Sequence, residues 1–293
     1  MDLTRFVERA TPLRVLNVLV SQNGELIGKY DWEGDIRRNA YSASKSFTSA
    51  AVGIAQKEGL LSIDEKLVDA FKEDLPDIVS PELEAATVRD LLTMSLGQEH
   101  PHLMGEQRPH YPETDWVKLS LSLPFTSMPG ETFLYNPVGP YLAGILVQRR
   151  AGQSLTAYLE PRLFTPLGIR HTVWEEDPLG CTFGAGGLFI CTEELHRFGQ
   201  LYLQEGNWNG KQLIPAEWVR ESLSIQGAAN PHNPYGYGYL FWGGPEGTFR
   251  ADGKYCQLSI ICRDKNAVIS MMSECRDEGT LMKAIFEEIW PQL

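Results

Sequence analysis

The chain has 293 residues and an ordinary globular composition, with 43% hydrophobic and 22% charged residues. Its 38 acidic and 26 basic side chains give a formal net charge of −12, which repels phosphate backbones and anionic membrane surfaces and excludes nucleic acid as an expected partner. No stretch approaches the roughly 18 uninterrupted apolar residues of a membrane span.

The N-terminus, MDLTRFVERATPLRVLNVLV, lacks the apolar core and the small-residue cleavage site of a signal peptide, which predicts an unexported protein. The five cysteines are an odd number in a chain without an export signal. They predict free thiols in a reducing compartment, so the expected location is the cytoplasm.

The first sixty residues predict a short helix, a β-hairpin and a buried helix. An amphipathic pattern covers residues 3–10. Residues 15–21 and 25–30 are strand-like and flank an Asn-Gly pair, which closes hairpins well. Over residues 42–58 the apolar and small side chains are spread too broadly for a surface helix, which predicts a largely buried one.

The rest of the chain alternates between helical and strand patterns. Short helices with Pro- and Gly-bearing loops are clearest at 88–96, 116–123, 140–150 and 155–163. Strand patterns return at 237–242, 248–251, 257–263 and 267–272, before a last helix at 278–289. Strands at both ends predict an α+β fold in which N- and C-terminal segments form one antiparallel sheet, flanked by helices, with an inserted, mostly helical region. The expected division is a sheet domain of residues 1–59 plus 184–293 and a helical domain of residues 60–183.

Ser42 and Lys45 form an S-x-x-K pattern at the head of the predicted buried helix. Residues three apart lie on one helix face, so the amine can reach the hydroxyl, and the helix N-terminus offers N–H groups to an oxyanion. The alternative is a helix-capping serine followed by a solvated lysine. A lysine at the start of a buried helix is costly without a partner or a role, which favours a nucleophile and a group that takes its proton.

Longer segments carry a resemblance to a known family. The run YSASKSFTSAAVGIAQKEGLLSIDEKL resembles the nucleophile helix of the β-lactamase-related serine hydrolases, which include class C β-lactamases, DD-peptidases and family VIII esterases. Four more segments follow in the family's order: TVRDLLTMSLG, PGETFLYNPVGPYLAG, PRLFTPLGI and GAGGLFICTEELHRFGQLYLQEGNWNGKQLIPAEWV. The resemblance covers most of the chain and implies a β-lactamase/transpeptidase-like fold.

The family's second catalytic element is Y-x-N, to which Tyr135-Asn136-Pro137 corresponds. The resemblance makes Tyr135 the proton-transfer partner, and the alternative is a core aromatic with a hydrogen-bonded hydroxyl. Pro137 removes the side-chain amide that binds the substrate amide in β-lactamases, which argues against that activity. Asn136 could substitute only if the loop were rotated.

The third element, usually K-T-G or H-x-G, corresponds by order to Ala251-Asp252-Gly253. Ala251 stands where penicillin-recognising members have a lysine for the substrate carboxylate, and Asp252 adds a charge that repels one. Gly253 lets the strand approach the substrate, or is simply a bulge glycine. The resemblance implies that the N–H of Lys254 joins that of Ser42 in the oxyanion hole. The Lys254 ammonium is also a possible substrate-binding cation, or a partner of Asp252.

These residues support acyl transfer, in which Ser42 attacks a carbonyl, Lys45 and Tyr135 move its proton, and water releases the acyl enzyme. Both proton-transfer groups have free pKa values near ~10, so the choice of base stays open. The expected function is hydrolysis of a small ester or amide, and the alternatives are a penicillin-recognising β-lactamase or DD-peptidase and a non-catalytic binding relative. The six histidines form no metal-binding pattern. We expect a small-molecule substrate, no cofactor, no metal, no nucleic acid and no membrane, and leave the oligomeric state open.

Overall fold

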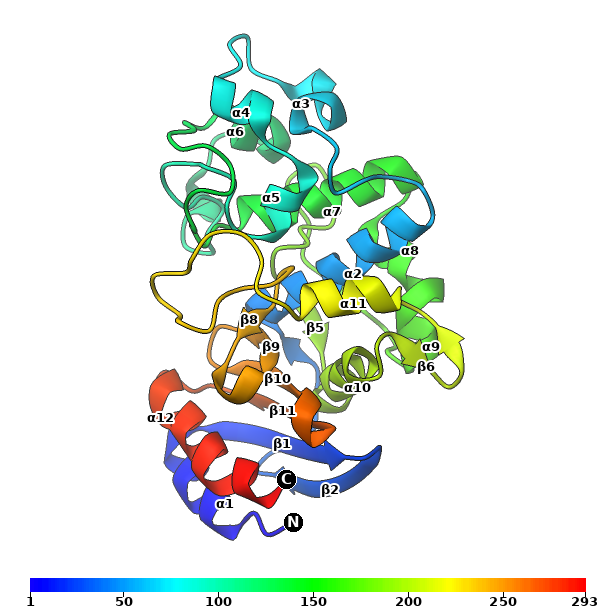
Figure 1. The fold of residues 1–293 in the computed structure, drawn as a ribbon, viewed down its shortest axis with the longest axis vertical. Helices are drawn as coiled ribbons and strands as arrows, with labels where there is room; N and C mark the ends of the chain where they lie inside the picture. The colour runs from blue at the N-terminus through cyan, green and yellow to red at the C-terminus, as the bar shows by residue number, and fades with distance from the viewer.

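The computed structural model describes residues 1–293, and a six-stranded antiparallel sheet lies in its lower half in Figure 1. The strand order is β2-β1-β11-β10-β9-β8, so the two ends of the chain meet in one sheet. The strands are β1 (Val15–Gln22), β2 (Glu25–Asp31), β8 (Trp242–Gly243), β9 (Phe249–Gly253), β10 (Gln257–Cys262) and β11 (Ala267–Ser273). This arrangement confirms the predicted α+β fold class.

The β1–β2 hairpin closes where the Asn-Gly pair predicts it. Asn23 and Gly24 have φ angles of 53° and 83°, the left-handed backbone that a two-residue type I′ turn needs. Asparagine and glycine adopt this conformation with little strain. Residues 15–21 of β1 are all buried, because the strand lies inside the sheet and both of its faces are covered.

The predicted strand at residues 237–242 is wrong. Of these residues only Trp242 belongs to a strand, β8, which pairs with β9, and the chain before it doubles back, with Leu240 at a φ of 62°. Gly238 lies so close to Ser222 that an added Cβ would be 2.0 Å from the Ser222 carbonyl oxygen. Close tertiary contacts therefore override the aromatic pattern that favours a strand.

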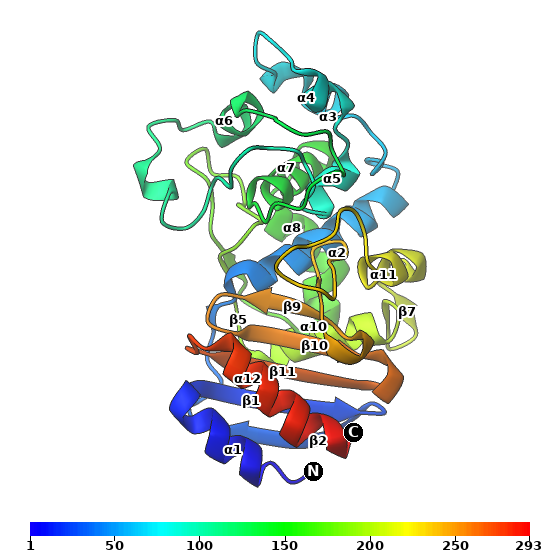
Figure 2. The ribbon, with the colours of Figure 1, turned by 60° about the vertical axis from the view of Figure 1, so that its left-hand side comes forward.

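Helices cover both faces of the sheet. The helices α1 (Thr4–Ala10) and α12 (Glu278–Ala284) lie side by side over one face, near both termini (Figure 2). With the sheet they enclose a separate core of 18 buried residues. The helix α10 (Thr192–Leu203) packs on the opposite face, against β1, β10 and β11.

The helix α2 (Ser44–Lys57) runs between the sheet and the remaining helices (Figures 1 and 2). Twelve of its 14 residues are buried, as the broad apolar pattern predicts. It packs against α7 (Val138–Ala151). The other helices are α3 (Leu67–Ala70), α4 (Pro81–Ala85), α5 (Val88–Leu92), α6 (Trp116–Ser122), α8 (Leu155–Leu159), α9 (Thr165–Leu167) and α11 (Ala216–Ser222).

A small three-stranded sheet ties the segment before α2 to the returning chain. Its order is β3-β5-β4, and its strands are β3 (Arg38–Asn39), β4 (Val173–Trp174) and β5 (Leu188–Ile190). The two-residue strand β4 lies within the region that the sequence predicts to be mostly helical. A separate hairpin consists of β6 (Asn207–Trp208) and β7 (Lys211–Gln212).

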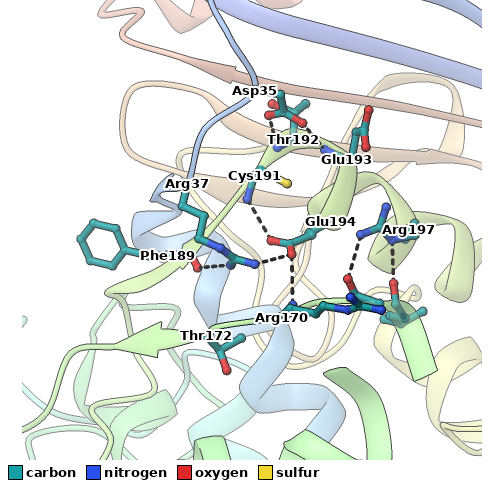
Figure 3. Close-up of polar contacts among 12 residues, drawn as sticks. Asp35, Arg37, Arg170, Thr172, Phe189, Cys191, Thr192, Glu193, Glu194 and Arg197 are labelled. Carbon is teal, nitrogen blue, oxygen red and sulfur yellow. Dashed lines mark hydrogen bonds and ion pairs between the residues drawn. The ribbon is translucent and has the colours of Figure 1, made fainter. Parts of the chain in front are cut away.

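Beside this small sheet, the first turn of α10 holds a buried carboxylate (Figure 3). The Glu194 side chain is 5% exposed and pairs with the Arg37 guanidinium. It also accepts N–H hydrogen bonds from Cys191 at 3.1 Å and Arg170 at 3.2 Å. These contacts fix the chain just before α2 to the start of α10.

The main core contains 61 buried residues and extends from the sheet through α2, α7 and α10 into smaller helices such as α5 and α6. The N-terminus of α2 therefore lies where the sheet and the helical part meet. All five cysteines carry free thiols. None of the helices combines the length and the apolar content that a membrane span requires.

Candidate active site

Ser42 lies on a single 3-10 turn, Tyr41–Ala43, that leads directly into α2. The Nζ of Lys45 is 2.7 Å from Ser42 Oγ and 2.6 Å from the carbonyl oxygen of Ala185. Lys45 is 2% exposed, and these oxygens are its only hydrogen-bond partners. Ser42 is partly exposed and lines a cavity, so a substrate can reach it.

The surroundings of Lys45 favour its neutral form. Burial lowers the pKa of the amine from 10.5 to about 7, and the nearby Arg108 guanidinium acts in the same direction. An amine with this pKa is unprotonated in a large fraction of molecules at neutral pH. It can therefore accept the Ser42 proton, which a lysine with an ordinary pKa could do only rarely.

Tyr135 reaches the same place from the loop before α7. Its ring stacks on Trp242 with 5.2 Å between the centroids, and the Nζ of Lys45 lies 5.1 Å from the Tyr135 ring centroid. Burial raises the pKa of the Tyr135 hydroxyl, a hydrogen bond with Ser42 acts in the opposite direction, and the Asp252 charge raises it further. Tyr135 is therefore a proton donor at neutral pH.

Gly253 brings the end of β9 against the turn that carries Ser42. A Cβ added at Gly253 would lie 2.1 Å from the carbonyl oxygen of Ala40 and 3.1 Å from the nitrogen of Ala43. Any larger residue would push the strand away, so close approach is the physical reason for glycine here. The next residue, Lys254, has an exposed side chain whose Nζ lies 5.3 Å from the Tyr255 ring centroid.

Asp252 pairs with Arg250 and not with Lys254, so the suggested Lys254–Asp252 pair is wrong. Arg250 Nε is 2.7 Å from the Asp252 carboxylate, and Arg250 Nη2 is 2.9 Å from Glu278. Arg250 lies two residues before Asp252 on β9, so the two side chains share a face of the strand. Burial raises the pKa of the Asp252 carboxyl, and Arg250 acts in the opposite direction.

The Asn136 side chain points away from Ser42 and Lys45. Its Nδ2 donates to Gln98 Oε1 at 2.7 Å, and its Oδ1 accepts from the N–H groups of His102 at 3.0 Å and Val138 at 3.2 Å. The side chain is buried and does not line the cavity that opens over Ser42, which is described below. The proline that follows it, Pro137, does line the cavity.

A cavity of about 870 Å³ opens over these groups. Besides Pro137, five of the candidate site residues predicted from the sequence line it: Ser42, Lys45, Tyr135, Asp252 and Lys254. Sequence reasoning did not single out four further lining residues, Arg108, Glu175, Phe183 and Trp242, nor the Ala185 carbonyl. The described chain contains no group of three or more His, Cys, Asp or Glu side chains placed to hold a metal ion.

Comparison with known proteins gives one family. The Beta-lactamase family model matches residues 5–290. An uncharacterized protein of Alkalihalophilus pseudofirmus is 28% identical over 211 residues, 66% of this chain and 56% of that protein. The lovastatin esterase of Penicillium rubens is 30% identical over 148 residues, 44% of this chain and 37% of the esterase. The chain thus spans about half the length of the first of these relatives and little more than a third of the second.

Among solved structures, a D-stereospecific amidohydrolase from Streptomyces sp. superposes with a TM-score of 0.74. Its sequence is 18% identical, and the superposition covers 98% of this chain and 99% of the amidohydrolase. At this identity the likeness concerns the fold. The whole described chain, including both the sheet and the helical part, follows that architecture.

Proposed function

The chain belongs to the β-lactamase family, and within it we propose a serine hydrolase that cleaves small esters or amides through a Ser42 acyl-enzyme. The observation that carries this proposal is the 2.7 Å contact between Ser42 Oγ and the buried Lys45 amine, whose pKa lies near 7. A non-catalytic relative would gain nothing from burying a lysine without an acidic partner.

The charges of the site support distinct roles for the two proton-transfer groups. Neutral Lys45 takes the Ser42 proton as Oγ attacks the substrate carbonyl. Tyr135, protonated because burial raises its pKa, gives a proton to the leaving group and recovers one from the Lys45 ammonium. In deacylation Lys45 takes a proton from the water that attacks the acyl carbonyl and returns it to Ser42 Oγ as the bond between Oγ and the acyl group breaks. The N–H groups of Ser42 and Lys254 would hold the oxyanion, since Gly253 brings the strand close to Ser42.

The lining of the cavity argues for esters and amides over β-lactams. Ala251 and Pro137 stand where a penicillin-recognising enzyme has a cation and an amide side chain, and the Asp252 carboxylate faces the cavity. Two similar proteins, one described as an esterase and the other as an amidohydrolase, agree with this substrate class. A β-lactam antibiotic presents a carboxylate, and this chain has no cation at position 251 to bind it.

The test combines covalent labelling with turnover. A serine-reactive fluorophosphonate should add one label per chain, and the labelled peptide should contain Ser42. Ser42→Ala should remain folded, take no label and lose at least ~10³-fold in kcat/KM for p-nitrophenyl butyrate. Unchanged turnover by folded Ser42→Ala would contradict the proposal. A kcat/KM for a chromogenic cephalosporin above that for the ester would favour the penicillin-recognising alternative.

A further inference from the structure

An ion pair between Arg108 and Glu175 lines the cavity beside the Ser42–Lys45 dyad. Arg108 Nη2 is 3.2 Å from Glu175 Oε2, and the two side chains are 23% and 39% exposed. Arg108 lowers the pKa of Lys45, and Glu175 contributes to raising that of Tyr41, the residue before Ser42. Both members of the pair line the cavity together with Ser42 and Lys45, and the proposed chemistry uses neither of them.

The chain from Trp174 to Leu188 holds the pair in place. The Glu175 N–H donates to the Gly187 carbonyl at 3.0 Å, and the Phe183 N–H donates to the Glu175 carbonyl at 2.8 Å. The Arg108 guanidinium lies 4.3 Å from the Phe183 ring centroid. Two residues after Phe183, the Ala185 carbonyl accepts a hydrogen bond from the Lys45 amine. One segment thus positions Arg108 and Lys45 together.

Gly187 makes room for the Glu175 side chain. Its φ is 82°, and an added Cβ would lie 2.5 Å from the Cβ, Cγ and Cδ atoms of Glu175. Any other residue would be strained at this φ and would displace the carboxylate from Arg108. The absence of a side chain at Gly187 therefore leaves the space in which the Glu175 side chain lies when it pairs with the Arg108 guanidinium.

Arg108 keeps most of its hydrogen-bonding capacity free. A guanidinium has five N–H donors, and Arg108 uses only Nη2 within the protein. Arg250, at the same cavity, bonds through Nε, Nη1 and Nη2. Arg108 thus brings unused donors to the wall of the cavity, whereas every guanidinium nitrogen of Arg250 has a partner within the protein.

We infer that Arg108 determines specificity by binding a second, uncharged carbonyl oxygen of the substrate, with Glu175 holding the guanidinium in place. This inference rests on the proposed function and narrows its substrates to esters and amides whose chain carries a further carbonyl, as N-acylated amino acids and peptides do. Arg108 is neutralised by Glu175, and Glu106, two residues before Arg108, also lines the cavity, so at this position a neutral acceptor fits better than a carboxylate. Arg108 supplies the polar contact that Pro137 cannot.

The experiment compares two esters that differ only in one carbonyl, phenyl 4-oxopentanoate and phenyl pentanoate. A hydrogen bond to a charged donor corresponds to roughly 10-fold or more in kcat/KM, so the full-length protein should prefer the oxo ester by about this factor after correction for hydroxide reactivity. Assays at pH 8.5, above the pKa of Lys45 of about 7, keep changes in Lys45 protonation from entering the comparison.

Variants assign the preference to Arg108. Arg108→Met keeps an aliphatic side chain over Phe183 but has no donors, so the ratio of the two kcat/KM values should fall to the chemical background. Arg108→Lys keeps the charge with fewer donors and should give an intermediate ratio. Glu278→Gln changes another cavity charge, on the far side of Arg250, and should leave the ratio unchanged.

The outcomes separate this inference from the proposed function. Ser42-dependent hydrolysis of phenyl pentanoate tests the hydrolase alone, and its absence would remove both proposals. A folded Arg108→Met variant that hydrolyses phenyl pentanoate and keeps the wild-type ratio would overturn the role of Arg108. A larger Arg108-dependent preference for the anionic monophenyl glutarate would overturn the choice of an uncharged acceptor.

Discussion

Replacing Lys45 with methionine should abolish hydrolysis and, at neutral pH, make the protein more stable. Methionine keeps a side chain of similar length but cannot be protonated. In the folded chain burial and Arg108 lower the lysine pKa from 10.5 to about 7. The unfolded chain therefore binds this proton more tightly than the folded chain does. The penalty on folding is fully present below pH 7 and disappears as the pH rises to 10.5.

The magnitude follows from the shift of 10.5 − 7 = 3.5 pKa units, or about 5 kcal/mol at 1.36 kcal/mol per unit. At pH 7, where the folded chain is half protonated, about 4 kcal/mol of this penalty applies. Methionine also leaves the buried Ala185 carbonyl without its donor, which costs about 1–3 kcal/mol. The net expectation at pH 7 is a free energy of unfolding larger by about 1–3 kcal/mol, or a few degrees in Tm.

Thermal unfolding of the wild type and of Lys45→Met at pH 7 and pH 10, followed by circular dichroism, measures this difference in stability. At pH 10 less than about 1 kcal/mol of the penalty remains, so the advantage of Lys45→Met should vanish or reverse. The cost of leaving the Ala185 carbonyl without a donor is the same at pH 7 and at pH 10, so it does not affect the comparison between the two pH values. A Tm difference between variant and wild type that stays constant from pH 7 to pH 10 would refute the reasoning.

Three more substitutions probe the site and its support. Tyr135→Phe deletes only the hydroxyl and should lower kcat/KM for p-nitrophenyl butyrate by roughly 10²-fold with an unchanged Tm; normal kinetics with a lower Tm would mean a merely structural ring. Gly253→Ala places a Cβ 2.1 Å from the Ala40 carbonyl and should reduce both turnover and, by about 1–3 kcal/mol, stability, whereas Gly279→Ala, whose nearest such contact is 3.8 Å away, should do neither. Glu194→Gln leaves Arg37 without its partner and should lower the urea-derived free energy of unfolding by about 2 kcal/mol with little change in kcat; a variant as stable as wild type would contradict this.

Local chemistry made part of the fold predictable. The Asn-Gly pair requires left-handed backbone, so the hairpin was predictable from two residues, and the unusually broad apolar pattern of α2 follows from burial on all sides. The helix α10 was not predicted, although Glu194 forms a capping arrangement with Cys191 at its start. The aromatic residues of 237–242 favour a strand, but contacts with α11 and α5 determine the conformation of that segment.

The candidate active site, too, was predictable from the sequence only in part. Ser42 and Lys45 are three residues apart on one helical face, so their contact follows from local geometry. The Arg108–Glu175 pair joins residues 67 positions apart, and no sequence pattern around either residue predicts their contact. The Ala185 partner of Lys45 is a backbone carbonyl, which any residue type supplies.

Three unfavourable features meet at the N-terminus of α2. Tyr41 has a φ of 47°, a strained value for this residue type that costs on the order of 1–3 kcal/mol. Lys45 is buried without an acidic partner. Gly253, which allows the close approach of β9, has no side chain to pack in its strand. Asn39 and Ser44 hold the Tyr41 backbone through hydrogen bonds of 2.7 and 2.6 Å, so surrounding structure enforces the strain. Since folding alone favours none of these features, their coincidence beside one partly exposed serine supports a catalytic role for this end of α2.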